Sequence, residues 1–163
     1  MPDHFQLNVV SSLDLATAER IASGSLAAAR EAGLLPLTVA VVDAGGQLVS
    51  FKREDGSGML RGDIAIAKAC ASVGIGVSSR TIGERMQARP GFQSAIAVAS
   101  GGRFAAVPGG VVVLDGDGRA IGAVGVTGDA SDRDEYAAIA GIKAAGLASH
   151  PAEPAENWEQ AGY

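Results

Sequence analysis

The chain has 163 residues, and its 13 basic and 18 acidic side chains give a formal charge of −5. Hydrophobic residues make up 47% and charged residues 19%, a balance typical of a folded globular protein. The acidic charge argues against nucleic acid as a partner, and the short apolar runs exclude a membrane-spanning helix. We expect a single domain over 1–163, with a core at about 10–148 and an irregular tail at 149–163.

The composition is rich in Gly and Ala and poor in aromatic residues, cysteine and histidine. There are 23 Gly and 31 Ala but only seven aromatic residues (one Trp, two Tyr and four Phe). Cys70 is the single cysteine, which excludes an intrachain disulfide and a thiolate zinc site. His4 and His150 lie near the two chain ends, so we expect no metal site. The first ten residues lack the basic flank and apolar core of a signal peptide, so a cytoplasmic protein is expected.

The first half of the chain predicts a helix, a hairpin and a second helix. Residues 12–32 carry apolar side chains at helical spacing after Ser11 or Ser12, either of which can cap the helix. Residues 37–43 and 47–52 predict two strands, joined by a turn too short for a parallel crossover. Helix 62–73 is apolar on nearly every side, so we expect it to be buried in the fold or at an interface.

The second half predicts a third helix, a second hairpin and a final helix. Ser78 or Ser79 can cap a helix that ends near Ala88, before Pro90 and Gly91, whereas residues 92–102 show no decisive pattern. The remaining predictions are a short strand at 104–107, strands at 111–114 and 119–126, and a helix from 131 to about 148. Hairpins impose antiparallel pairing, so we predict an α/β (α+β) protein rather than a doubly wound nucleotide fold.

Lys68 is the most informative polar residue. It is the only charged side chain between Asp63 and Arg80, in a helix of small apolar residues. An ammonium group there must reach water, pair with a carboxylate or lose its proton more easily. Asp43 and Asp55 are the expected partners, and all three are candidate catalytic residues. A purely structural ion pair is the alternative.

Two further segments are candidate ligand-binding sites. Arg53 opens a charged, glycine-bearing loop that forms either a pocket rim or a solvated turn. Thr127, Gly128 and Asp129 lie between a strand and a helix, where free backbone N–H groups can hold an anion or simply cap the helix. Neither a phosphate-binding glycine motif nor a GxSxG hydrolase elbow is present.

Four segments, in order, carry a resemblance to a known family. They are VAVVDAGGQLVSFKREDGSG (39–58), DIAIAKACAS (63–72), PGGVVVLDGDGRAIGAVGVTG (108–128) and DRDEYAAIAGI (132–142). Together they resemble the HbpS/GlcG-like family, which includes the C-terminal domain of PduO-type proteins. The resemblance implies a profilin-like α/β/α arrangement of layers around a five-stranded antiparallel sheet. It also implies homo-oligomers, from dimers to octamers.

The same resemblance implies a heme-related role, because the family is labelled heme-binding or heme-degrading. Iron ligation in relatives by an N-terminal histidine or a threonine makes His4 and Thr127 the candidates here. Helix 12–32 contains no histidine, and seven aromatic residues offer few rings to stack on a porphyrin. Many family members are encoded beside genes for small-molecule catabolism.

Three functions follow as hypotheses. The first is a small-ligand-binding protein of the HbpS/GlcG type, with heme or a related tetrapyrrole as ligand. The second is a lyase, isomerase or hydrolase that acts on a small carboxylated or hydroxylated metabolite near a subunit interface, where Arg53 holds a carboxylate and Lys68 moves a proton. The third is a structural or accessory oligomer without a ligand.

Overall fold

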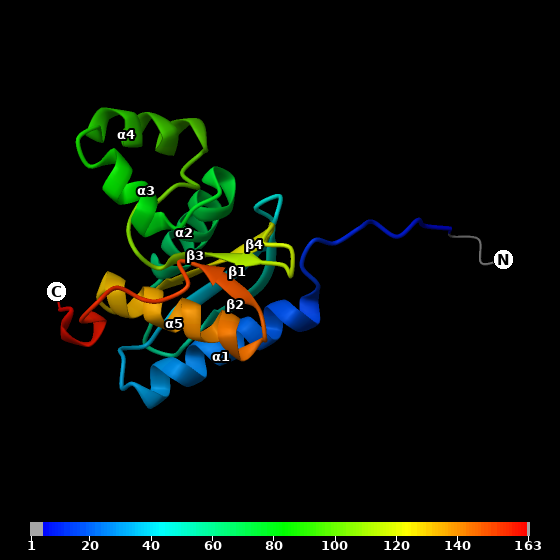
Figure 1. Ribbon diagram of the computed structural model, residues 1–163, viewed down its shortest axis with the longest axis horizontal. Coiled ribbons are helices and arrows are strands. Elements are labelled where there is room, and N and C mark those ends of the chain that lie inside the picture. Colours follow the sequence, from blue (N-terminus) through cyan, green and yellow to red (C-terminus); the bar gives the residue numbers. More distant parts are fainter. Residues whose placement is uncertain (1–4, 163) are drawn as a thin grey trace.

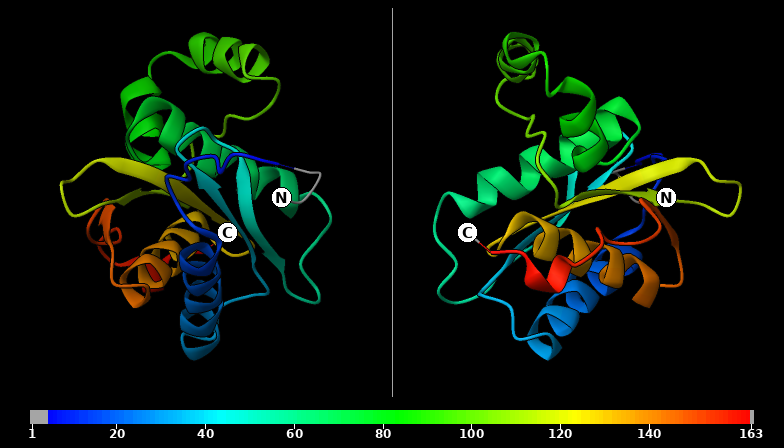
Figure 2. Two further views of the ribbon diagram at one scale, coloured as in Figure 1. Left: turned by 90° about the vertical axis from the view of Figure 1, so that its right-hand side faces the viewer. Right: turned by 60° about the vertical axis from the view of Figure 1, so that its left-hand side comes forward.

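The computed structural model describes residues 5–162 and has the form of a sheet between helical layers (Figures 1 and 2). Its elements in chain order are α1 (Leu15–Glu31), β1 (Thr38–Asp43), β2 (Leu48–Arg53), α2 (Arg61–Ile75), α3 (Ser79–Met86), α4 (Pro90–Ala99), β3 (Gly110–Leu114), β4 (Ala120–Thr127), α5 (Ser131–Ala144), β5 (Ala148–His150) and a 3-10 turn (Trp158–Gln160).

The five strands form one antiparallel sheet in the order β2-β1-β4-β3-β5. The two long helices α1 and α5 pack side by side on one face, where Ile21, Ile139 and Ile142 meet valines of the central strands. On the opposite face α2 packs against β4, β1 and β3, with α3 and α4 beyond it (Figure 1). The predicted layered α/β arrangement with a five-stranded antiparallel sheet is confirmed.

Three local predictions need correction. Asp14, rather than Ser11 or Ser12, caps α1, because its side chain accepts a hydrogen bond from the Thr17 N–H at 2.7 Å. Pro90 does not only end α3: it stands in the first turn of α4, where a missing N–H costs nothing. Residues 104–107 form no strand, and β5 supplies the fifth strand instead.

The C-terminal segment is more ordered than an irregular tail. The rings of Tyr136 and Trp158 stack with centroids 3.7 Å apart. The buried carboxylate of Glu135 accepts a hydrogen bond from the Ala155 N–H at 3.2 Å and pairs with Arg80 at 3.0 Å. These contacts hold the segment after β5 against α5. In the described part of the chain, no helix has the length and apolarity required to cross a membrane.

Glycines allow α2 to lie almost directly on the sheet. A Cβ atom added to Gly125 in β4 would overlap the carbonyl oxygen of Ala65 and would lie 2.8 Å from the Ala69 nitrogen. A Cβ atom at Gly110 in β3 would overlap the carbonyl oxygen of Lys68. Both obstacles are helix backbone, which cannot move aside as a side chain can. The close approach of helix and strand therefore requires glycine at these two positions.

We expect Gly125→Ala to lower the free energy of unfolding by about 1–3 kcal/mol or more, because the methyl group would push α2 off the sheet. Gly74→Ala is the matched control, since a Cβ there meets nothing within 4 Å and alanine favours a helix. Urea unfolding followed by circular dichroism measures both changes. Equal stability of the two variants would contradict the role of Gly125.

Candidate functional site

A buried ion pair connects α2 to α5 beneath the end of β4. The Lys68 ammonium donates to the Asp134 carboxylate at 3.0 Å and to the Val126 carbonyl oxygen at 3.0 Å. The side chains of Lys68 and Asp134 are 2% and 1% exposed. The second carboxylate oxygen of Asp134 accepts a hydrogen bond from the Asp129 N–H at 3.0 Å. The partner of Lys68 is therefore Asp134, and not Asp43 or Asp55 as expected from the sequence.

Burial pushes both members of this pair toward their neutral forms. Desolvation lowers the pKa of Lys68, although the nearby Asp134 charge opposes this. Desolvation also raises the pKa of Asp134 to about 6, against the opposing influence of Lys68. Shifted pKa values of this kind are typical of functional groups. Here, however, Lys68 and Asp134 form their hydrogen bonds with other groups of the protein.

Two backbone N–H groups at the predicted anion site, those of Asp129 and Ala130, already bind carboxylates of the chain. Besides the Asp129 N–H, the Ala130 N–H donates to the Asp129 side chain at 2.7 Å. The other Asp129 oxygen accepts from the Leu35 N–H at 2.8 Å, and the Thr127 hydroxyl accepts from Arg61 at 3.0 Å. Gly128 has a φ of 154° and lies against the Pro36 carbonyl oxygen. The ligand-binding role of this segment stays a prediction.

The other sequence candidates lie apart from Lys68. Asp43 closes its own hairpin turn, because one carboxylate oxygen accepts from the N–H groups of Gly45 and Gln47 at 2.9 and 3.0 Å. Arg53 and Asp55 are exposed and line a surface depression that also includes Glu54. Lys68 is not among the residues that line this depression. The catalytic roles of these residues stay predictions.

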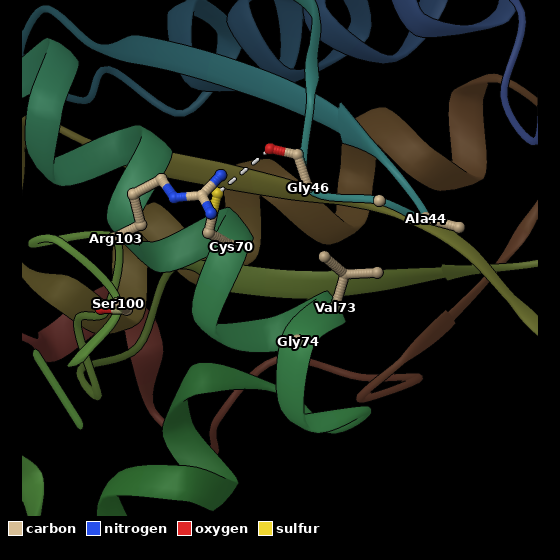
Figure 3. Close-up of a pocket in the computed structure, with 8 residues that line it drawn as sticks. Ala44, Gly46, Cys70, Val73, Gly74, Ser100 and Arg103 are labelled. Atoms are coloured by element: carbon tan, nitrogen blue, oxygen red, sulfur yellow. Dashed lines mark hydrogen bonds between the residues drawn. The ribbon is translucent and has the colours of Figure 1, made fainter.

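A different cavity, of about 210 Å³, lies between the β1–β2 turn, α2 and the turn after α4 (Figure 3). The Cys70 thiol lies at its floor and donates to the Gly46 carbonyl oxygen at 3.4 Å. The guanidinium of Arg103 extends over this thiol from the turn after α4. The remaining lining residues are Ala44, Gly45, Val73, Gly74 and Ser100.

The charges in this cavity are unbalanced. Arg103 makes no hydrogen bond or ion pair with any residue in the described range 5–162, and no carboxylate lines the cavity. Burial raises the pKa of the Cys70 thiol, and Arg103 opposes this only in part, so the thiol stays neutral. The planar Arg103 guanidinium is thus available to a ligand, beside cavity walls made of uncharged residues. It suits an anionic group attached to a small organic body.

Sequence reasoning missed Arg103, although the sequence contains a signal for it. Arg103 is the only charged residue between Arg89 and Asp115, just as Lys68 is the only one in its own stretch. The same criterion that singled out Lys68 therefore applies to Arg103. A larger hollow of about 650 Å³ beside α3 offers no comparable group, since its only cationic lining residue, Arg80, already pairs with Glu135.

Comparison with known proteins decides the family. The family model described as "Haem degrading protein HbpS-like" matches residues 13–143. The chain belongs to the HbpS-like family. No curated protein matches this HbpS-like chain. The match ends before β5, so the last strand and the segment held against α5 lie beyond it.

Solved structures with the same fold agree with this assignment. The PduOC:heme complex has a TM-score of 0.75 at 21% identity, covering 86% of this chain and 99% of its own. Klebsiella pneumoniae ORFY has a TM-score of 0.74 at 23% identity, with coverages of 90% and 97%. A double mutant of Streptomyces reticuli HbpS has a TM-score of 0.69 at 26% identity, with coverages of 88% and 95%.

The buried pair predicts a pH-dependent mutant effect. Lys68→Met should lower the free energy of unfolding by about 3–5 kcal/mol at about pH 7.5, because it leaves a buried carboxylate without its partner. The pKa of Asp134 is about 6 in the folded protein, above its ordinary 3.8. As the pH falls, Asp134 therefore becomes protonated in the folded state at a higher pH than in the unfolded state. A protonated Asp134 needs no cation, so the loss should be smaller at about pH 5.

Urea titrations at both pH values measure this difference. Lys143→Met is the control, because Lys143 pairs with Glu153 at an exposed site and its removal should change little at either pH. If Lys68→Met lowers the free energy of unfolding equally at the two pH values, the protonation of Asp134 does not govern the destabilisation.

Proposed function

We propose that this chain is a small-ligand-binding protein of the HbpS type, and that its ligand is a small organic anion held by Arg103. The observation that carries the proposal is the Arg103 guanidinium, which faces the cavity over Cys70 without a partner in the described chain. A guanidinium binds a carboxylate through two parallel hydrogen bonds, so one arginine can both hold and orient such a group.

The size of the cavity limits the ligand. Its volume of about 210 Å³ lies below the roughly 300–1,000 Å³ typical of sites for drug-sized molecules. Val73 and Ala44 supply apolar contacts, and Gly45, Gly46 and Gly74 leave room because they carry no side chain. We therefore expect a ligand with one carboxylate or similar anionic group and a short or planar apolar body.

Heme requires a separate test against the residues, because a heme complex is among the structural relatives. Heme iron takes His, Cys, Met or Tyr as its usual axial ligands. Within residues 5–162, Cys70 is the one such residue lining a cavity described above, and that cavity is too small for a porphyrin. The Thr127 hydroxyl is bound to Arg61, and His4 lies outside the described residues. None of these three cavities of the single chain therefore combines room for a porphyrin with an axial ligand.

The enzyme hypothesis has weaker support within one chain. It requires Arg53 and Lys68 to act on one substrate, but Arg53 is exposed at a surface depression whereas Lys68 is enclosed by Asp134 and Val126. Nucleophilic catalysis by Cys70 is also unfavourable, since burial keeps its thiol protonated. Ligand binding requires neither the joint action of Arg53 and Lys68 nor a deprotonated Cys70 thiol.

A panel of small carboxylates, including succinate and benzoate, tests the proposal by thermal shift and calorimetry. We expect at least one to bind the wild-type protein, and Arg103→Ala to weaken its binding by about 10- to 100-fold, the loss of one charge-assisted contact. Arg85→Ala is the matched control, because Arg85 is an exposed arginine outside the cavity. Equal weakening by both variants would indicate a nonspecific charge effect.

A second variant tests the cavity without removing a charge. Gly74 lines the cavity, and a Cβ atom there meets nothing within 4 Å, so the side chain of Gly74→Leu should occupy the cavity. We expect it to abolish binding of the same carboxylate while thermal stability is kept or raised. Gly74→Ala should bind more nearly as the wild type does. Unchanged affinity in Gly74→Leu would place the ligand elsewhere.

Hemin titration separates the two ligand classes. We expect no saturable shift of the Soret band at stoichiometric hemin, because no described cavity combines sufficient size with an axial ligand. A saturable shift at one hemin per chain would favour the tetrapyrrole instead, and Thr127→Ala and His4→Ala would then locate the iron ligand by their spectra.

A further inference from the structure

The segment before α1 carries apolar side chains that are almost fully exposed. Its odd positions are Phe5, Leu7 and Val9, whose side chains are 78%, 74% and 86% exposed, and polar residues stand between them. Residues 5–12, called the arm below, form neither helix nor strand, and Figure 1 shows them leading away from the sheet. Solvated segments are normally polar, because exposed apolar surface is unfavourable in water. The alternation indicates that one side of the arm packs against protein in another state of the molecule.

The base of the arm is fixed at the rim of the cavity that contains the free guanidinium. The Ser12 hydroxyl accepts a hydrogen bond from the Ala44 N–H at 2.9 Å, and Ala44 lines this cavity. The next residue, Leu13, is buried in the core and holds the base in place. An extended chain rises about 3.3 Å per residue, so Val9 and Leu7 lie within about 10–17 Å of chain from this anchor. Both side chains can therefore reach the cavity mouth.

The cavity opens to solvent, and the arm has the chemistry to cover it. Arg103 extends over the Cys70 thiol, but the space beside Gly74 and the β1–β2 turn is unfilled (Figure 3). No charged residue occurs from Phe5 to Leu13, so the arm brings no carboxylate that would neutralise the guanidinium. Its apolar side is suited to cover the apolar body of a ligand whose anionic group is bound by that guanidinium.

A sheet edge is the other surface that an extended segment normally joins. Strand β2 lies at one edge of the sheet, so one side of its backbone has no neighbouring strand. This strand carries Lys52 and Arg53, and charged side chains on an edge strand disfavour the addition of another strand. The cavity presents no such obstacle, because its lining residues other than Arg103 are uncharged. The cavity is therefore the more favourable place for the apolar side of the arm.

We propose that the arm closes over the cavity and that Leu7 and Val9 form its outer wall. Closure exposes less apolar surface than the open position, so it occurs without a ligand and covers Cys70. When an anion is bound to Arg103, the same two side chains contact its apolar body and favour apolar acids over polar ones. This second part rests on the proposed function, whereas the closure itself does not.

The single cysteine makes closure measurable without a ligand. Iodoacetamide alkylates the Cys70 thiol at the cavity floor, and mass spectrometry follows the rate at about pH 9, where more of the thiol is ionised. We expect the joint substitution Leu7→Ser and Val9→Ser to raise this rate at least about threefold, because a polar arm stays in the open position. Gln6→Ser with Asn8→Ser is the matched control on the polar side of the arm, and it should leave the rate unchanged.

A disulfide distinguishes this closure from an arm that enters the cavity of a neighbouring chain. Leu7→Cys, treated with oxidised glutathione, should link to Cys70 within one chain and keep the mass of 16.3 kDa under denaturing, non-reducing conditions. A linked pair of chains would overturn the proposal, and so would the absence of a disulfide between positions 7 and 70. Equal alkylation rates in the double serine variant and its control would overturn it as well.

Binding of benzoate, the apolar member of the carboxylate panel, separates this inference from the proposed function. We expect Leu7→Ser with Val9→Ser to weaken benzoate binding by about 3- to 10-fold, and Arg103→Ala to weaken it further. Faster alkylation in the serine variant without binding of any carboxylate would uphold closure and contradict the proposed ligand. Carboxylate binding through Arg103 with an unchanged alkylation rate would contradict closure and leave the proposed function intact.

Discussion

The contact between the backbone of α2 and the glycines of the sheet determines most of the structure. At Gly125 and Gly110 the strands carry no side chain, and the carbonyl oxygens of Ala65 and Lys68 occupy the space that a Cβ atom would need. A helix this close to a sheet can present only small side chains to it, which Ala65, Ala69 and Ser72 provide. The abundance of Gly and Ala in the composition is thus a requirement of this packing.

The same contact buries an ammonium group. With α2 held against β4, the Lys68 side chain reaches the Val126 carbonyl oxygen and continues to Asp134 at the start of α5. Asp134 in turn accepts from the Asp129 N–H, so one carboxylate connects a helix, a strand end and a turn. Burial costs both charges part of their hydration, and removal of either one leaves the other without compensation. The pair therefore favours one arrangement of the two helical layers.

The cavity and α4 occur where this tight packing ends. Ser72 still lies against Gly110 of β3, but near Gly74 and the β1–β2 turn the space beside α2 is open rather than filled. The turn after α4 closes this space with Arg103, the single charge of a long apolar stretch. The proposed ligand site therefore lies where the chain leaves space unfilled, and a ligand can supply the missing contacts there.

Much of the fold was predictable from the sequence, because hydrophobic periodicity and turn residues can be recognised within short stretches of the chain. The helices α1, α2, α3 and α5 and the strands β1 to β4 were expected within a few residues of their bounds, and the Ser78 cap of α3 was confirmed. Helix α4 and strand β5 were missed, since residues 92–102 are mostly small and show no decisive pattern and β5 has only three residues.

The site was less predictable, because it depends on residues far apart in the chain. The sequence by itself singled out Lys68 as a charge that must find a partner, but Asp134 is 66 residues away and only the packing of α5 beside β4 brings it within 3.0 Å. The same holds for Arg103 and Cys70, whose proximity requires α2 and the turn after α4 to meet. The sequence determined which residue types each element carries and how each element begins and ends. The tertiary structure alone decided which of these groups meet, because burial and charge compensation act between elements that only the folded chain brings together.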